Sequence, residues 1–171
     1  GVIFDLGVSN IQLLSDQRGF SFLHKEALLD MRLDKDGQGV NAADLLNCLR
    51  EDQLKKMFSV TLMPNQANYI VKNILLAREI KPFGKVGDFV RICANLKVKG
   101  SLHPATLPFL ALRIAVNSEL ENLKEALPKA LGLIKEGGKL LVIVFHSGER
   151  EILLDFVRQG RENNVLTLVT D

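Results

Sequence analysis

The sequence predicts an α/β protein in which a parallel sheet is interrupted by a helical insertion. Two short and mainly apolar runs, residues 2–4 and 139–145, have the composition of strands buried on both faces. Polar residues follow each run at once: Asp5 after the first, and His146 with Ser147 after the second. Between the two runs, apolar residues recur mostly at helical spacing, which indicates a separate helical subdomain.

The first strand stops at Asp5 and leads into a loop over residues 6–10. In open α/β sheets, ligands bind just beyond the carboxyl ends of the parallel strands, which places Asp5 at a site. An aspartate at a strand end is also a common turn former. The stretch alone leaves both interpretations open.

A long loop is predicted over residues 15–39, where glycines and aspartates mark turns. Phe20 and Phe22 are expected to pin this loop to the body of the protein. A loop of this length without regular structure is usually functional or disordered, and its aromatic residues favour a function.

Helices are predicted next, with Asn41 as the N-cap of the first and Pro64 near the start of the third. Their expected extents are residues 42–49, 51–58, 64–81 and 86–96. Basic residues cluster in the second half of this stretch: Lys81, Lys85, Arg91, Lys97 and Lys99. They form either a solvated face or a surface that contacts nucleic-acid phosphates.

The last third of the chain is predicted to return to the sheet. Residues 109–127 form one long amphipathic helix, and Pro128 starts a separate short one. The second strand, residues 139–145, is followed by a helix over 149–159 and by a third, alternating strand over 165–169. If the first two strands are parallel neighbours, Asp5, Gln12 and His146 build a site at one edge of the sheet.

The net charge, the cysteine count and the lengths of the apolar runs limit the classes of protein to which this chain can belong. The chain has 171 residues and a formal net charge of +2, which argues neither for nor against a polyanionic partner. Its two cysteines have no neighbouring partners, so we expect no disulfide framework and no metal site. We expect neither a membrane span nor a signal peptide. Because the chain opens directly on a strand, we expect Gly1 to be an interior residue of a longer protein.

Seven segments, in order, resemble one family closely. They are DLGVSNIQL (5–13), RGFSF (18–22), LDMRLD (29–34), NAADLL (41–46), HPAT (103–106), ALRIAVNSEL (111–120) and GGKLLVIVFHS (137–147). In this set the chain resembles the middle and later part of the bacterial and organellar ribosomal RNA (cytosine-N4)-methyltransferases, which use S-adenosylmethionine.

The resemblance implies a partial class I (Rossmann-like) methyltransferase domain over residues 1–14 and 107–171. Residues 15–106 would be a loop and an inserted helical subdomain that recognises the substrate. The implied reaction is N4-methylation of a cytidine in small-subunit ribosomal RNA. The implied location is the cytoplasm, or the mitochondrial matrix in a eukaryote, and the oligomeric state stays open.

The resemblance also assigns residues. Asp5 and Gln12 would contact S-adenosylmethionine. The Ser9 hydroxyl would accept hydrogen bonds from the target amine, and His146 and Ser147 would line the pocket for a cytosine that must be unstacked to enter it. The residues expected to face RNA phosphates are Lys85, Arg91, Lys97, Lys99 and Arg113.

The chain departs from the family's pattern in several respects. The family's early glycine-rich turn, its GGH-type segment and its later Asn-Pro-Arg-Ser-Arg-Ser-type ending are missing from this sequence. Residues 61–65 stand in place of a Tyr-Gly-Glu-Glu-Arg-like segment, Leu107 stands where the family has an arginine, and residues 146–154 lose basic residues of the family's pattern. We therefore expect weak RNA affinity and weak or absent activity from this chain alone. Two alternatives stay open: a non-catalytic relative that binds RNA or a protein, and a different α/β nucleotide-binding enzyme.

Overall fold

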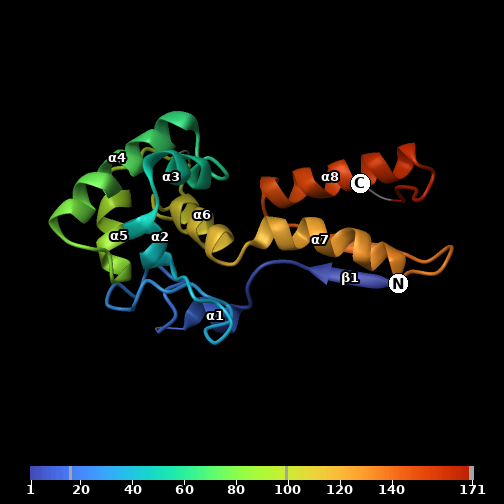
Figure 1. The fold of residues 1–171 in the computed structure, drawn as a ribbon, viewed down its shortest axis with the longest axis horizontal. Helices are drawn as coiled ribbons and strands as arrows, with labels where there is room; N and C mark the ends of the chain where they lie inside the picture. Colours follow the sequence, from blue (N-terminus) through green and yellow to red (C-terminus); the bar gives the residue numbers. More distant parts are fainter. Residues whose placement is uncertain (16, 99, 170–171) are drawn as a thin grey trace. The chain divides into compact units, whose positions relative to one another are not determined.

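The computed structural model describes residues 1–15, 17–98 and 100–169 of the chain. Within them lie ten elements (Figure 1). They are β1 (Val2–Asp5), α1 (Asn10–Leu14), α2 (Ala42–Cys48), α3 (Glu51–Phe58), α4 (Pro64–Ile80), α5 (Val86–Cys93), α6 (Thr106–Val116), α7 (Glu119–Gly132), β2 (Leu140–Ile143) and α8 (Ser147–Glu162). The chain divides into two compact units: a sheet unit, Gly1–Gly7 with Ser118–Asp171, and a helical unit, Val8–Asn117.

In the sheet unit, β1 and β2 pair in parallel, with Val2 opposite Leu140 and Asp5 opposite Ile143. This confirms the predicted α/β class and the predicted parallel pairing of the two strands. Helices α7 and α8 pack against each other in the same unit (Figure 1).

The expectation that both strands are buried on both faces is wrong. Side chains alternate along each strand between half-buried and exposed positions. Ile3, Leu141 and Ile143 are 70%, 49% and 43% exposed, so that face of the sheet is only partly covered.

The long helix predicted over residues 109–127 is also wrong, because the chain breaks at Asn117 and Ser118. Ser118 adopts a left-handed backbone conformation with φ of 48°. The Asn117 side chain donates to the carbonyl of Met31, 86 positions earlier, and to that of Arg113 at the end of α6. These bonds hold the end of α6 in place, and α7 begins as a separate helix at Glu119.

Pro128 lies inside α7 and does not start a separate helix. Proline removes one helical hydrogen bond, yet α7 continues because Leu123, Leu127 and Ala130 bury one apolar stripe across the proline turn.

The predicted third strand over residues 165–169 is not formed in the described structure. Asn164 adopts a left-handed conformation after α8, and the Val165 N–H donates to the Gly160 carbonyl at 2.8 Å. These contacts close the end of the helix. Alternation predicts a strand only where a neighbouring strand can pair with it, and none does here.

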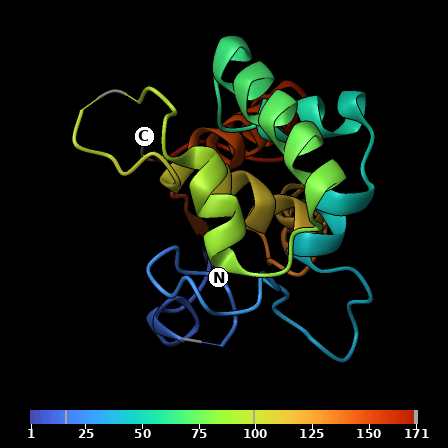
Figure 2. The same cartoon turned by 90° about the vertical axis from the view of Figure 1, so that its left-hand side faces the viewer.

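In the helical unit, α2 to α6 surround a core of buried aromatic and aliphatic residues (Figure 2). The ring of Phe89 lies 6.0 Å from that of Phe58 and 5.4 Å from that of Phe109. Asn41 caps α2 as predicted, since its side chain accepts from the Asp44 N–H at 3.0 Å. Pro64 begins α4, where its missing N–H costs nothing.

The long loop over residues 15–39 is confirmed as irregular, and polar contacts hold it to the helical unit. The Arg18 guanidinium donates to the carbonyls of Arg32 and Leu33, at 2.8 Å each. The Leu33 N–H donates to the Asn117 side chain at 2.8 Å.

The two phenylalanines pin the loop as expected. Phe20 is only 6% exposed, and the Phe22 ring stacks on His103 with ring centres 4.4 Å apart.

Candidate functional site

Asp5 and His146 lie at the same edge of the sheet, as the sequence predicts. Asp5 ends β1 opposite Ile143, the last residue of β2, and His146 follows three positions later. The Leu6 N–H donates to the Ile143 carbonyl at 3.4 Å, so the two strands stay paired up to their ends. Asp5 is exposed and His146 is half-buried. The sheet therefore delivers an acidic side chain and an imidazole to one edge.

His146 is the N-cap of α8, and Ser147 is the first residue of that helix. Nδ1 of His146 accepts from the Glu149 N–H at 3.4 Å. In return, the Glu149 carboxylate accepts from the Phe145 N–H at 2.7 Å and from the His146 N–H at 3.3 Å. This capping box satisfies N–H groups that a helix start leaves without partners.

A third side chain completes this cluster. Glu119, in the first turn of α7, offers a carboxylate oxygen close to His146 and Glu149, and the three ligand atoms all lie within 4.8 Å of one another. Sequence reasoning missed both glutamates. The spacing of His146 and Glu149 across one helical turn is a usable signal, but Glu119 lies 27 positions before His146 and carries none.

Ser9 and Gln12 belong to the helical unit, where they cap α1. The Gln12 carboxamide oxygen accepts from the Ser9 N–H at 2.9 Å, and the Ser9 hydroxyl oxygen accepts from the Gln12 N–H at 3.3 Å. The sequence predicts a loop over residues 6–10 but not the short helix that follows. The two side chains therefore have a structural role that the sequence interpretation did not assign to them.

A model of the MraW methylase family matches residues 1–167 of the chain. The chain belongs to this family. Proteins named "Ribosomal RNA small subunit methyltransferase H" are similar over most of its length. The protein from Methylacidiphilum infernorum (isolate V4) is 45% identical over 159 residues, which are 92% of this chain and 50% of that protein.

The protein of the same name from Coprothermobacter proteolyticus is 41% identical over 163 residues, which are 95% of this chain and 54% of that protein. The one from Rickettsia bellii is 38% identical over 169 residues, which are 96% of this chain and 54% of that protein. The chain thus spans about half the length of the curated relatives it matches.

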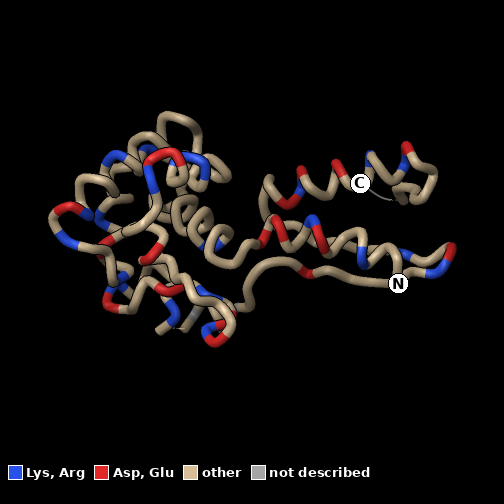
Figure 3. The backbone as a smooth tube through the Cα atoms, viewed as in Figure 1, with Lys and Arg blue, Asp and Glu red and all other residues tan. Residues whose placement is uncertain are grey.

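Two of the residues expected to face RNA are ion-paired in this family member. Lys85 Nζ lies 2.7 Å from a Glu26 oxygen, and this hydrogen bond raises the pKa of Lys85. Arg91 pairs with Asp88. Acidic and basic residues are interspersed over the helical unit (Figure 3). An acidic neighbour weakens the attraction of each cation for a phosphate.

The other three expected RNA-binding residues differ in their surroundings. Lys97 is exposed, and its carbonyl accepts from the Gln66 side chain at 2.6 Å. Arg113 is half-buried on α6. Lys99 lies outside the described residues.

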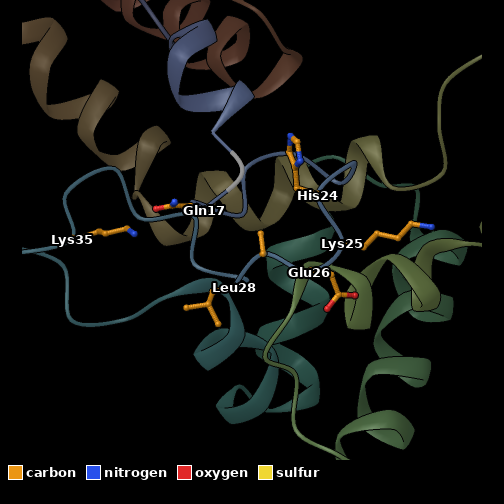
Figure 4. Close-up of a pocket in the computed structure, with 7 residues that line it drawn as sticks. Gln17, His24, Lys25, Glu26, Leu28 and Lys35 are labelled. Carbon is orange, nitrogen blue, oxygen red and sulfur yellow. The ribbon is translucent and has the colours of Figure 1, made fainter.

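A wide, open depression of about 700 Å³ lies in the helical unit (Figure 4). Its lining consists of Gln17, His24, Lys25, Glu26, Ala27, Leu28 and Lys35. None of the site residues expected from the sequence lines it. None of the described helices is both long and apolar enough to cross a lipid bilayer.

Proposed function

We propose that this chain is the middle and later part of an S-adenosylmethionine-dependent enzyme that methylates N4 of a cytidine in small-subunit ribosomal RNA. Membership of the MraW methylase family and the names of the relatives support this assignment. The observation that carries it is the parallel pairing of β1 and β2, which brings Asp5 and His146 to one edge of the sheet. Ligands of open α/β folds bind at such edges.

The proposed fold is a partial class I, Rossmann-like methyltransferase domain over residues 1–14 and 107–171. Residues 15–106 are proposed as an inserted helical subdomain that recognises the substrate. The division of the chain into a sheet unit and a helical unit supports two parts of different roles. Its boundaries, after residue 7 and after residue 117, differ from the proposed ones by 7 and 11 residues, so that α1 and α6 fall in the helical unit.

The proposed reaction is an in-line methyl transfer. Bound S-adenosylmethionine would supply a methyl group, which would pass from the sulfonium sulfur to N4 of cytosine, and N4 would lose one proton to water. The N4 lone pair is delocalised into the ring, so N4 is a poor nucleophile and the enzyme must orient it. Backbone carbonyls near Ser9 and the Ser9 hydroxyl are the proposed acceptors for the amine hydrogens.

Asp5 and Gln12 are the proposed contacts to the methyl donor. The Asp5 carboxylate accepts hydrogen bonds at the edge of the sheet. The Gln12 oxygen is used by the capping box, so its amide NH₂ is the group proposed to donate to the cofactor. His146 and Ser147 are the proposed walls of the cytosine pocket.

RNA binding is proposed to depend on Lys97 more than on Lys85 and Arg91, because those two cations already pair with Glu26 and Asp88. Lys99 and Arg113 complete the proposed RNA-facing set. The proposed location is the cytoplasm, or the mitochondrial matrix in a eukaryote. The chain alone is expected to bind RNA weakly and to have little or no activity.

The second candidate function is a non-catalytic module that binds RNA or protein. The observation in its favour is that the helical unit has a continuous apolar core of its own, running from Phe20 to Val116. Such a unit can present a binding surface without a complete cofactor site.

Calorimetric titration of the 171-residue chain with S-adenosylmethionine tests the proposal. We expect weak binding that Asp5→Asn reduces by roughly 10-fold or more, as loss of a hydrogen bond to a charged group does. Asp36→Asn, at an exposed position of the long loop, is the matched control and should leave binding unchanged.

Two results separate the candidates. Binding of a ribosomal RNA fragment without any binding of S-adenosylmethionine would favour the non-catalytic module. If the chain binds S-adenosylmethionine and Asp5→Asn does not weaken that binding, the proposal that the cofactor binds at this edge of the sheet is wrong. Mass spectrometry of the RNA after incubation reports methylation directly, and strong methylation by this chain would contradict the expected weak activity.

A further inference from the structure

Three side chains that the sequence does not connect meet in the sheet unit. Glu119 lies in the first turn of α7, His146 caps α8, and Glu149 lies in the first turn of α8. Their ligand atoms lie within 4.8 Å of one another. Two neighbouring carboxylates alone are a common surface feature. The imidazole of His146 therefore decides whether this cluster is a ligand site.

The imidazole of His146 is buried and one of its nitrogens lacks a hydrogen bond. The side chain is 9% exposed, and Nε2 has no hydrogen-bond partner among the residues that the structure describes. Nε2 lies 3.3 Å from Oε1 of Glu149, at an angle that makes no hydrogen bond. Buried polar atoms without partners are rare in folded proteins, and a bound ion is one explanation for them. Nε2 faces Oε1 of Glu149, a member of the cluster, and this unpartnered nitrogen marks the cluster as a ligand site.

The second glutamate is arranged to share an ion with this imidazole. Oε2 of Glu149 accepts from the Phe145 and His146 N–H groups, which leaves Oε1 directed at Nε2. Glu149 is 3% exposed. The two backbone N–H groups compensate Oε2 alone, and a cation between Oε1 and Nε2 would give both of these buried atoms a partner.

We propose that Glu119, His146 and Glu149 bind one Zn²⁺ ion, which ties the first turns of α7 and α8 to the end of β2. One imidazole and two carboxylates are a ligand set that zinc accepts, with Zn–N and Zn–O distances of about 2.0–2.2 Å. Ligands at those distances lie roughly 3–4 Å apart around a tetrahedral ion, which the 3.3 Å between Nε2 and Oε1 satisfies.

Coordination through Nε2 puts the imidazole proton on Nδ1. The bond from the Glu149 N–H to Nδ1 is then given up, and at 3.4 Å it is the longest bond of this cap. The zinc site uses Nε2 of His146 and the carboxylates of Glu119 and Glu149, and the proposal holds whether or not the edge of the sheet binds a methyl donor.

Zinc titration of the whole 171-residue chain, stripped with a chelator, tests the proposal. A Cys48→Ser background is used because Cys48 is an exposed thiol and an obvious adventitious ligand. We expect one equivalent of Zn²⁺ to bind by calorimetry, and Glu119→Gln to weaken binding at least 10-fold. Glu121→Gln is the matched control, since Glu121 is exposed on the same helix.

His146→Asn is the second variant. Asparagine is a preferred N-cap, so α8 keeps its cap while the imidazole ligand is lost. Zinc should raise the melting temperature of the Cys48→Ser chain and of Glu121→Gln, but not that of Glu119→Gln or His146→Asn. No zinc binding, binding that both ligand variants retain, or binding that disappears with Cys48→Ser alone would each overturn the proposal.

Discussion

The helical unit and the sheet unit are stabilised in different ways. Buried apolar residues run through the helical unit from Phe20 to Val116 and form one continuous cluster. The sheet unit buries fewer, mainly along α7, and exposes Ile3 and Leu141 on its sheet. Tertiary packing of apolar faces supplies most helix stability in proteins. The helical unit therefore has a core of its own, whereas the candidate chemistry of the sheet unit sits at the ends of its strands.

The two units also differ in how their buried polar groups are hydrogen-bonded. Asp30 and Asn117, in the helical unit, are hydrogen-bonded to neighbouring backbone and side chains. In the sheet unit, Nε2 of His146 has no such bond, although Nε of Arg18 is a similar case in the helical unit. A satisfied buried network fixes a fold, whereas an unsatisfied group at a strand end points to a ligand.

Phe89→Ala should give the largest loss of stability. Phe89 is fully buried between Phe58, Phe83 and Phe109, so truncation leaves a cavity that costs about 3–5 kcal/mol. The counterpart in the sheet unit is Leu127→Ala on α7, also fully buried, with an expected loss of about 2 kcal/mol. Urea unfolding of both variants measures the difference. An equal or larger loss from Leu127→Ala would break the comparison between the units.

Asn117→Ala should cost somewhat less, about 2–3 kcal/mol, because it leaves buried backbone groups without partners. The Leu33 N–H loses its acceptor, and the Met31 carbonyl loses its donor. Asn68→Ala, at an exposed position of α4, is the matched control and should change stability by less than about 0.5 kcal/mol. Thermal unfolding measures both. Similar melting temperatures for the two variants would show that the Asn117 contacts do not hold the loop.

Local signals predicted much of this fold. Asn41 and Pro64 mark helix starts by their own chemistry, and the polar residues after each strand mark the edge of the sheet. These features can be predicted from a few neighbouring residues. The same local reasoning failed where a structural feature depends on residues far apart in the sequence. The break after α6 depends on the hydrogen bond from Asn117 to Met31. The spacing of apolar residues along the chain cannot predict this bond.

The candidate site also has some features that the sequence predicted and others that it did not. Parallel pairing of two strands was enough to place Asp5 and His146 at one edge. The approach of Glu119 to His146 depends on how α7 and α8 pack, and a single sequence carries no signal for that contact. The cap formed by Ser9 and Gln12 was missed because a helix of five residues has almost no periodicity.

Asp30→Asn should have the smallest effect, and that effect should depend on pH. Burial raises the pKa of Asp30, but hydrogen bonds and charge from Arg32 outweigh this and lower it below its ordinary value of 3.8. A carboxyl with a depressed folded-state pKa contributes stability above its unfolded pKa and loses it as the pH falls through the folded one. The wild-type chain should therefore exceed Asp30→Asn by about 1–2 kcal/mol at pH 7.

That difference should shrink in urea titrations below about pH 4, where Asp30 becomes protonated. Asp36→Asn, exposed on the same loop, is the control, and its effect should be close to zero at both pH values. A difference that persists unchanged at pH 3 would mean that shape, and not the charge shared by Asp30 and Arg32, holds the loop. The hydrogen bonds around Asp30 would then be less important for the stability of the helical unit than its apolar core, which would sharpen the contrast with the sheet unit.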